Sequence, residues 1–346
     1  MAEHDLHQAA RKIFDSALRS VDAHESVRRT VVLDDTRLDV ADVQLDLTSY
    51  QAGVYAIAIG KAAVPMAAAL EDALGTYLRG GLIAGPVAGQ PFGRELAFTP
   101  RKLTTVWRWC EGGHPLPNKA SLLAARECFE LLERANVANA LIIFLISGGG
   151  SAMIEWPRDD RITLSELRQA NHELVSCGAS IAEINSVRRA FSAVKGGKLA
   201  ARAPNADQIT LIISDTNPGD EATVASGPTM PPAANSPLAT DVVERYSSRL
   251  SSLPSSVLKA IKEAESDEGH SDISDNKYYV LMDNQSVIEA AAAEARQLGF
   301  KVDVAYDINE QPIDEGSPLL VSRVRALWEQ AGRAQEPVCL ISGGEF

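Results

Sequence analysis

The chain has 346 residues, 45% of them hydrophobic and 23% charged, an ordinary globular composition with room for two domains. Its net charge of −13 argues against nucleic acid or an anionic membrane as a general partner, because both need a basic surface. The sequence has no apolar run long enough to span a membrane and no apolar signal segment, and its four cysteines form no CxxC pair. We therefore expect a cytoplasmic protein with free thiols.

The first elements along the chain are an amphipathic helix over residues 5–20 and a weak strand pair within residues 30–50. A buried strand, Tyr55–Ile59, then runs directly into Gly60 and Lys61, which a helical pattern follows. A lysine at such a junction places a cation beside a helix N-terminus, where anions bind. A solvated surface lysine is the alternative, and the Walker spacing G-x-x-x-x-G-K-[ST] is absent.

Two further short strands are expected at residues 80–87 and 104–110. They lead to the loop 111–121, which two glycines and two prolines shape. His114 lies in this loop, where it either contacts a ligand or makes a structural hydrogen bond. A helix over residues 119–135 leads to the next strand.

The most informative stretch is Leu141–Ser151, LIIFLISGGGS. Its six leading apolar residues predict a strand buried on both faces, and the glycines let the backbone turn sharply and expose consecutive N–H groups. Such N–H groups form a concave nest for an anion, whereas a plain turn would need only one glycine. We interpret the stretch as a binding site for a phosphate or carboxylate. Its residues are Ser147, Gly148, Gly149, Gly150 and Ser151.

A helix over residues 162–175 precedes a second informative helical stretch, residues 179–203. In that stretch the polar residues fall at i, i+3, i+7 and i+10, which predicts one face beside the apolar stripe. They are Asn185, Arg188, Ser192 and Lys195. Polar groups at the border of a buried face tend to line a cleft, and a solvated basic face is the alternative.

Two carboxylates follow the next predicted strand, Gln208–Ile213. Asp215 and Asp220 lie in the loop SDTNPGD, and a Ser-Gly-Pro turn, ASGPT, comes soon after. Paired carboxylates suit a hard cation such as Mg²⁺, and one of them could instead accept a proton from a hydroxyl. Acidic residues in Pro/Gly loops are also common in ordinary turns.

The C-terminal part begins after two helical pieces, within residues 236–265, that Pro254 separates. We expect an N-terminal domain over residues 1–265, a linker over 266–277 and a C-terminal domain over 278–346, the last with a β-α-β-α-β pattern. The sequence LISGG occurs twice, at Leu145–Gly149 and Leu340–Gly344, each time closing a predicted strand.

The predicted fold is two-domain α/β, with a parallel, Rossmann-like sheet in the N-terminal domain and a smaller α/β C-terminal domain. Ligands of such sheets bind at the carboxyl ends of strands. Those ends carry Gly60 and Lys61, the glycine-rich stretch, the acidic loop and the second SGGE sequence. A nest, cations and acids at one edge together favour phosphoryl transfer.

Five motifs in this order resemble the glycerate 2-kinase family, some members of which are known as hydroxypyruvate reductases. The motifs are AIGKAA (58–63), GGHPLPNKAS (112–121), LISGGGSA (145–152), INSVRRAFSAVKGGKLA (184–200) and ISDTNPGDEATVASGPT (213–229). The resemblance implies phosphorylation of D-glycerate at its 2-hydroxyl by ATP and Mg²⁺, in a cleft between two α/β domains. The oligomeric state is left open, with a homodimer as the candidate assembly.

The resemblance also implies roles for individual residues. Lys61 would contact the transferred phosphate or the substrate, and Asp215 or Asp220 would hold Mg²⁺ or orient the hydroxyl. The substrate carboxylate needs a cation. The side that binds it would be lined by Asn185, Arg188, Arg189 and Lys195.

One departure from the family pattern lies at the end of the sequence. The family's C-terminal domain continues past SGGE into a glycine-rich stretch that carries an active-site arginine, whereas this sequence stops at Phe346. We therefore expect either a C-terminal domain that is truncated in this sequence or an activity that is reduced or absent. Two alternatives stay open: an NAD(P)-dependent hydroxypyruvate reductase, although no G-x-G-x-x-G fingerprint is present, and a protein that binds glycerate or nucleotide without turnover.

Overall fold

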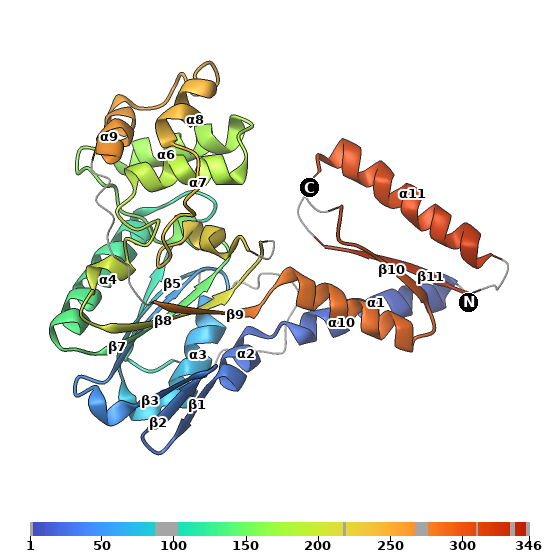
Figure 1. Cartoon of the computed structure of the whole chain (residues 1–346), viewed down its shortest axis with the longest axis horizontal. Coiled ribbons are helices and arrows are strands. Elements are labelled where there is room, and N and C mark those ends of the chain that lie inside the picture. Colours follow the sequence, from blue (N-terminus) through green and yellow to red (C-terminus); the bar gives the residue numbers. More distant parts are fainter. Residues whose placement is uncertain are drawn as a thin grey trace. The chain divides into compact units, whose positions relative to one another are not determined.

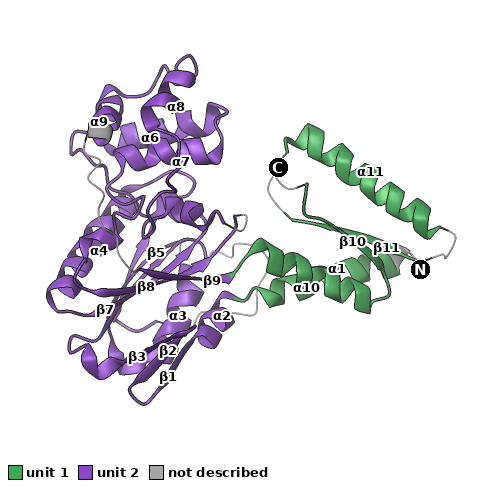
Figure 2. Ribbon diagram, in the orientation of Figure 1, with its two compact units in different colours: residues 1–22, 282–346 green, residues 23–281 purple. Residues whose placement is uncertain are grey.

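The computed structural model describes residues 3–86, 103–216, 219–266, 276–308, 311–332 and 336–343. The chain divides into two compact units, one of residues 23–281 and one that joins residues 1–22 to residues 282–346 (Figure 2). Among the described helices, none is both long enough and apolar enough to cross a membrane.

The larger unit is built on a six-stranded sheet in which β4 pairs in parallel with β5 and β7, β5 with β6, and β7 with β8 (Figure 1). In spatial order the strands are β6 (Trp107–Glu111), β5 (Leu78–Gly85), β4 (Val54–Ile59), β7 (Leu141–Ser147), β8 (Asp207–Ile213) and β9 (Lys277–Met282). The direction of travel through the sheet reverses between β4 and β7. This reversal is the topological switch point, where open α/β sheets bind ligands.

Both faces of the sheet are buried, as the continuous apolar runs predict. Along β4, Ala56 and Ala58 face one hydrophobic core, whereas Ile57 and Ile59 face the other. The first core also holds α2 (Ala23–Thr30), α3 (Ala63–Leu74) and the antiparallel strands β1 (Val31–Asp34), β2 (Arg37–Val40) and β3 (Val43–Asp46). On the other face, α4 (Lys119–Val137) covers the sheet.

Four helices form a third core within the larger unit, grouped at the top of Figure 1. They are α6 (Leu164–Ser176), α7 (Ile181–Phe191), α8 (Ala239–Arg245) and α9 (Ser255–Ser266). Short helical turns complete the unit: η1 (Leu47–Ser49), η2 (Gly75–Tyr77), α5 (Gly150–Met153), η3 (Ala200–Arg202) and η4 (Glu221–Ser226).

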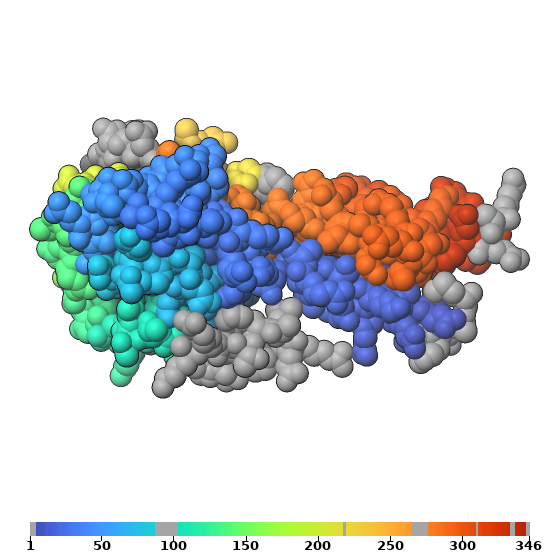
Figure 3. All heavy atoms as spheres, turned by 90° about the horizontal axis from the view of Figure 1, so that it is seen from below, coloured from blue at the N-terminus to red at the C-terminus, as the bar shows by residue number. Residues whose placement is uncertain are grey.

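The smaller unit contains a parallel pair of strands, β10 (Lys301–Ala305) and β11 (Val338–Ser342), with α1 (Glu3–Ser20), α10 (Asn284–Gln297) and α11 (Ile313–Ala331). The helices α1 and α10 lie side by side (Figure 3), and Ile13 and Ala17 of α1 share a core with Ile288 and Ala291 of α10.

The α/β fold class is confirmed, but the chain divides at other places than we expected. The first 22 residues group with the C-terminal unit because the apolar stripe of α1 packs on α10. The expectation that the β-α-β-α-β pattern after residue 278 forms one sheet is wrong, because its first strand, β9, borders β8 in the large sheet. The greater part of the expected linker, residues 267–275, lies outside the described residues.

Candidate functional site

The glycine-rich turn after β7 lies at the switch point of the large sheet. Gly149 has left-handed backbone angles (φ 79°) and begins α5, whose first turn no side chain caps. A Cβ on Gly148 would lie 1.9 Å from Oδ2 of Asp215, and one on Gly149 would lie 3.0 Å from the Lys61 side chain and 3.2 Å from that of His114. The turn therefore needs glycine because three polar side chains pack against its backbone.

The end of β4 is joined to this turn through Ser147. The Ser147 hydroxyl accepts a hydrogen bond from the Ala62 N–H (3.0 Å) and donates one to the Ile59 carbonyl (3.2 Å). In addition, the Lys61 N–H donates to the Gly148 carbonyl (2.9 Å). Ser147 is 2% exposed. Its hydroxyl thus holds two strand ends together, and the backbone of the turn is left to meet a ligand.

Lys61, His114 and Asp215 bring three kinds of chemistry to the turn. All three side chains are exposed. Partial burial and the positive charge of Lys61 lower the pKa of His114, so its imidazole is neutral at neutral pH. An ammonium group, an imidazole whose neutral form is favoured and a carboxylate therefore pack against the backbone of one turn.

The second predicted acid, Asp220, lies at the start of η4 with its side chain exposed. Its carbonyl accepts hydrogen bonds from the Thr223 N–H (2.8 Å) and hydroxyl (2.6 Å). Among the described contacts, the Asp215 carboxylate lies against the glycine turn, and none places the Asp220 carboxylate there. Within the described residues, no group of three or more His, Cys, Asp or Glu side chains is arranged to hold a metal.

Ser151 and Asn185, predicted from separate motifs, meet through Ser226. The Ser226 hydroxyl lies 2.6 Å from the Ser151 hydroxyl and donates to Oδ1 of Asn185 (2.8 Å). Ser226 and Asn185 are both 2% exposed. The glycine-rich turn is thereby tied to α7 through buried hydroxyl groups.

Lys195 is entirely buried and forms an ion pair with Glu155, which is 1% exposed. Its ammonium group also donates to the Ser151 carbonyl (2.8 Å), and the Ser192 hydroxyl donates to Oε1 of Glu155 (2.6 Å). Burial lowers the pKa of Lys195, against the opposing effect of the Glu155 charge. Lys195 thus contacts the backbone of the turn at the Ser151 carbonyl.

The predicted helical face that joined Asn185 and Arg188 to Ser192 and Lys195 is wrong in its second half. Helix α7 ends at Phe191, and Ser192 is extended (φ −105°, ψ 142°) in a bridge with Pro157. The Ser192 hydroxyl accepts from the Val194 and Lys195 N–H groups, an alternative to continuing the helix.

Cations outnumber carboxylates around Glu155. Burial lowers the pKa of Arg188 and of Arg189, and Arg188 Nε donates to Oδ1 of Asn171 (2.9 Å). Burial and the nearby charge of Arg158 lower the pKa of Lys198 to about 8. The positive groups are Arg158, Arg188, Arg189, Lys195 and Lys198. Such an excess of positive charge suits an anionic ligand.

Sequence reasoning missed Glu155 and the role of Ser226. A signal for Glu155 was present, because a lone carboxylate between Ile154 and Trp156 in an apolar stretch needs a buried partner. Ser226 had only the signal of its Ser-Gly-Pro turn, which does not reveal what its hydroxyl contacts.

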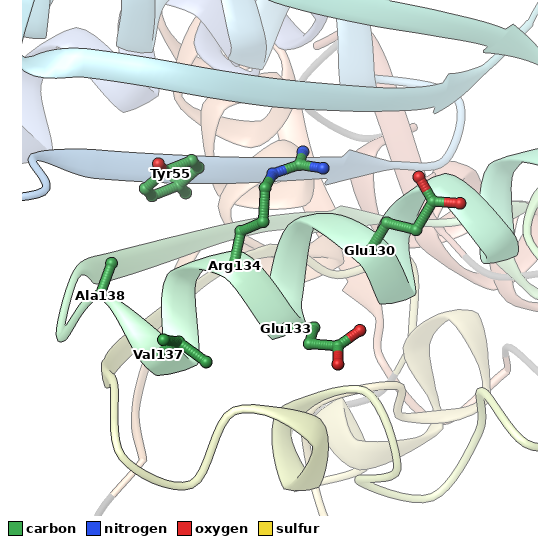
Figure 4. Close-up of a pocket in the computed structure, with 6 residues that line it drawn as sticks. All are labelled: Tyr55, Glu130, Glu133, Arg134, Val137 and Ala138. Atoms are coloured by element: carbon green, nitrogen blue, oxygen red, sulfur yellow. The ribbon is translucent and has the colours of Figure 1, made fainter.

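A cavity of about 560 Å³ lies elsewhere, between the start of β4 and the end of α4. In Figure 4, Arg134 extends from α4 toward the strand that carries Tyr55. The lining residues are Tyr55, Glu130, Glu133, Arg134, Val137 and Ala138. Because Tyr55 is near the amino end of β4, this cavity is distinct from the site at the carboxyl ends.

Comparison with known proteins defines the class. Residues 9–262 match the family described as "Domain of unknown function (DUF4147)". The chain is similar to the glycerate 2-kinase of Pyrococcus horikoshii, with 32% identity over 99% of this chain and 74% of that protein. It also resembles the crystal structure of a glycerate kinase from Thermotoga maritima, with a TM-score of 0.74 and 27% identity over 99% of this chain and 74% of that one.

The chain therefore belongs to the glycerate 2-kinase family, as the five motifs predict. A more distant relative from Agrobacterium vitis, 30% identical over 68% of this chain and 52% of its own length, carries hydroxypyruvate reductase in its name. The chain spans about three quarters of the length of the Pyrococcus and Thermotoga proteins.

Proposed function

We propose that this protein is a kinase that transfers the terminal phosphoryl group of ATP to the 2-hydroxyl of D-glycerate, forming 2-phosphoglycerate. The observation that carries the proposal is the convergence of Lys61, His114 and Asp215 on the glycine-rich turn at the switch point of the sheet. Phosphoryl transfer needs little covalent chemistry from a protein, and is catalysed by positioning and by neutralising charge.

The turn supplies the phosphate-binding part. Consecutive N–H groups around Gly149 form a nest for phosphate oxygens, and the Lys61 ammonium neutralises charge beside it. No side chain occupies these N–H groups as a cap. A Cβ on Gly148 or Gly149 would collide with Asp215, Lys61 or His114, so glycine at both positions lets these side chains pack against the turn.

The acidic loop fits Mg²⁺. This ion prefers oxygen ligands and is usually bound by one or two carboxylates, with waters and substrate phosphates completing its shell. Asp215 and Asp220 offer exposed carboxylates of this kind, and a preformed cluster of three ligands is not required. Bound Mg²⁺ would supply charge neutralisation to the phosphates. Asp215, which packs against Gly148, is the better placed of the two to meet them.

The substrate side follows from the charges along α7. Glycerate carries a carboxylate, for which a guanidinium is the strongest partner. Arg188 and Arg189 come from the last turn of α7, and burial disfavours their charged forms until an anion arrives. We assign the carboxylate to these two arginines, with Asn185 beside them on the same helix.

The four cysteines are all free, in keeping with a cytoplasmic location, which we also propose. A second candidate function is the reduction of hydroxypyruvate, because the Agrobacterium relative is named a hydroxypyruvate reductase. The missing G-x-G-x-x-G fingerprint weighs against it.

The test is an assay of the 346-residue chain with ATP, Mg²⁺ and D-glycerate, in which ADP release is followed. Parallel reactions contain L-glycerate or hydroxypyruvate, and a further pair contains hydroxypyruvate with NADH or NADPH. ADP release that depends on D-glycerate supports the kinase. Oxidation of the nicotinamide cofactor without ADP release would replace it with the reductase, and neither signal would reject both.

A further inference from the structure

Three consecutive buried residues at the end of η4 have left-handed backbone angles. The φ values are 52° for Ala225, 62° for Ser226 and 62° for Gly227. Glycine adopts this conformation freely, but a residue with a Cβ does so at a cost in free energy. Such strain persists only where the surroundings impose it, and it concentrates at functional sites.

Ser226 makes contacts that explain why the strain is retained. Its hydroxyl donates to Asn185 Oδ1 (2.8 Å), and a hydroxyl has a single proton. The proton in the 2.6 Å contact with Ser151 therefore comes from Ser151. The Ser226 carbonyl also accepts from the Gly196 N–H (3.1 Å), which holds the strained peptide in place.

Ser151 is consequently fixed from two sides. Its hydroxyl is bound by Ser226, and its carbonyl accepts from the buried Lys195 ammonium (2.8 Å), which Glu155 holds in an ion pair. Ser151 directly follows Gly150 in the nest of N–H groups. Because both the hydroxyl and the carbonyl of Ser151 are held, the neighbouring N–H groups keep one direction before a ligand binds.

We propose that Ser226 is a positioning residue that orients the phosphate-binding turn through Ser151. The proposal rests on the proposed function, because it takes the turn to be the phosphate site. Donors that are aimed at a developing charge in advance act most strongly in the transition state. Loss of the Ser226 hydroxyl should therefore lower kcat more than it raises KM.

The test compares Ser226→Gly with Ser226→Ala and with Ala41→Gly. Ser226→Gly removes both the hydroxyl and the strain, while Ser226→Ala removes the hydroxyl alone. Ala41 is the control because it is also left-handed (φ 52°) but exposed, in the turn between β2 and β3. For each variant, kcat, the two KM values, the melting temperature and the affinity for MgATP are measured.

Both Ser226 variants should lose about tenfold or more in kcat, with KM for D-glycerate little changed. Ser226→Gly should melt at a higher temperature than Ser226→Ala, because it also relieves the left-handed strain, and Ala41→Gly should keep full activity. Unchanged kcat in Ser226→Gly would overturn the proposal. A kcat that recovers in Ser226→Gly in step with its higher melting temperature would overturn it too, by showing a purely structural role.

The MgATP measurement separates this proposal from the proposed function. If the unchanged protein does not phosphorylate D-glycerate, the kinase assignment fails by itself. Weaker MgATP binding by both Ser226 variants would then still support the positioning of the turn. In that case, equal affinity in all variants, or no binding at all by the unchanged protein, would reject it.

Discussion

The sequence LISGG occurs at the ends of two strands that have very different surroundings. In β7 every residue is buried and the strand is central in a six-stranded sheet, whereas β11 belongs to a two-stranded sheet and most of its residues are half-buried. Ser147 holds the end of β4 through two hydrogen bonds, whereas among the described residues the Ser342 hydroxyl makes one, which it donates to the Ile308 carbonyl (3.0 Å).

The charges around the two copies are also opposite in character. Near the first copy, burial lowers the pKa of Arg188, Arg189 and Lys198, and the cations outnumber the carboxylates. In the unit of the second copy, Asp303 and Asp307 raise the pKa of Arg323. Near the first copy, burial therefore disfavours the charged forms of these cations, whereas near the second copy carboxylates favour the charged form of Arg323.

The comparison teaches that the five residues specify only a strand and a turn. The candidate site differs from the second copy in the side chains that pack on its turn, namely Lys61, His114 and Asp215. The predictions that follow change these surroundings and use matched positions in the unit of the second copy as controls.

The largest effect is expected for Lys61→Met. Loss of one cation beside a transferred phosphoryl group should lower kcat by about 10²–10³-fold, measured as ADP release with saturating substrates. The control is Lys301→Met, at the exposed start of β10, which should retain activity within about twofold of the unchanged protein. Equal losses in the two variants would remove the distinction between the copies.

Asp215→Asn should lower kcat by about 10²-fold and raise the Mg²⁺ concentration needed for half-maximal rate. Asp220→Asn should have a smaller effect, because only Asp215 packs against the turn. Asp314→Asn, in the exposed first turn of α11, is the control. A Mg²⁺ titration of the rate for each variant decides, and a larger loss in Asp220→Asn would reverse the assignment of the two acids.

Removing one partner of the buried ion pair should cost far more stability than removing one partner of the exposed pair. Glu155→Gln leaves Lys195 charged and buried, so the free energy of unfolding should fall by about 3–5 kcal/mol. Arg323→Met breaks the more exposed pair with Asp303 and should cost about 0–1 kcal/mol. Urea denaturation measures both. Similar costs would show that the surroundings of the two copies do not differ in this way.

A further effect is a dependence of stability on pH. The pKa of Lys198 falls from 10.5 to about 8 on folding, so between these values the unfolded chain binds more protons. The free energy of unfolding should therefore rise with pH across this window, relative to Lys198→Met. Urea denaturation of both proteins at about pH 7 and about pH 10 measures the difference in slope. A relative fall with pH would contradict the burial of a disfavoured charge.

The fold was largely predictable where a local sequence pattern determines the secondary structure. The continuous apolar runs of β4, β7 and β8 predicted buried strands, and the helical pattern over residues 162–175 predicted α6. The pairing of β9 with β8, and the packing of α1 on α10, were not predictable. Strand order and helix docking depend on contacts between distant segments, which local periodicity does not encode.

The site was predictable as a set of strand ends, and less so as a set of contacts. Gly148 and Lys61 were found because both follow buried strands. The buried position of Lys195 was missed because a helical period was continued past Phe191, where the Ser192 hydroxyl ends it. Nothing in the sequence placed Ser226 beside Ser151.

The central claim is that the turn at Ser147–Ser151 supports transfer of phosphate to glycerate. The most direct measurement is phosphorus NMR of the product formed from ATP, Mg²⁺ and D-glycerate by the unchanged protein and by Lys61→Met. The account predicts the resonance of 2-phosphoglycerate with the unchanged protein and its near absence with the variant. A phosphorylated product formed equally by both, or no phosphoglycerate at all, would contradict it.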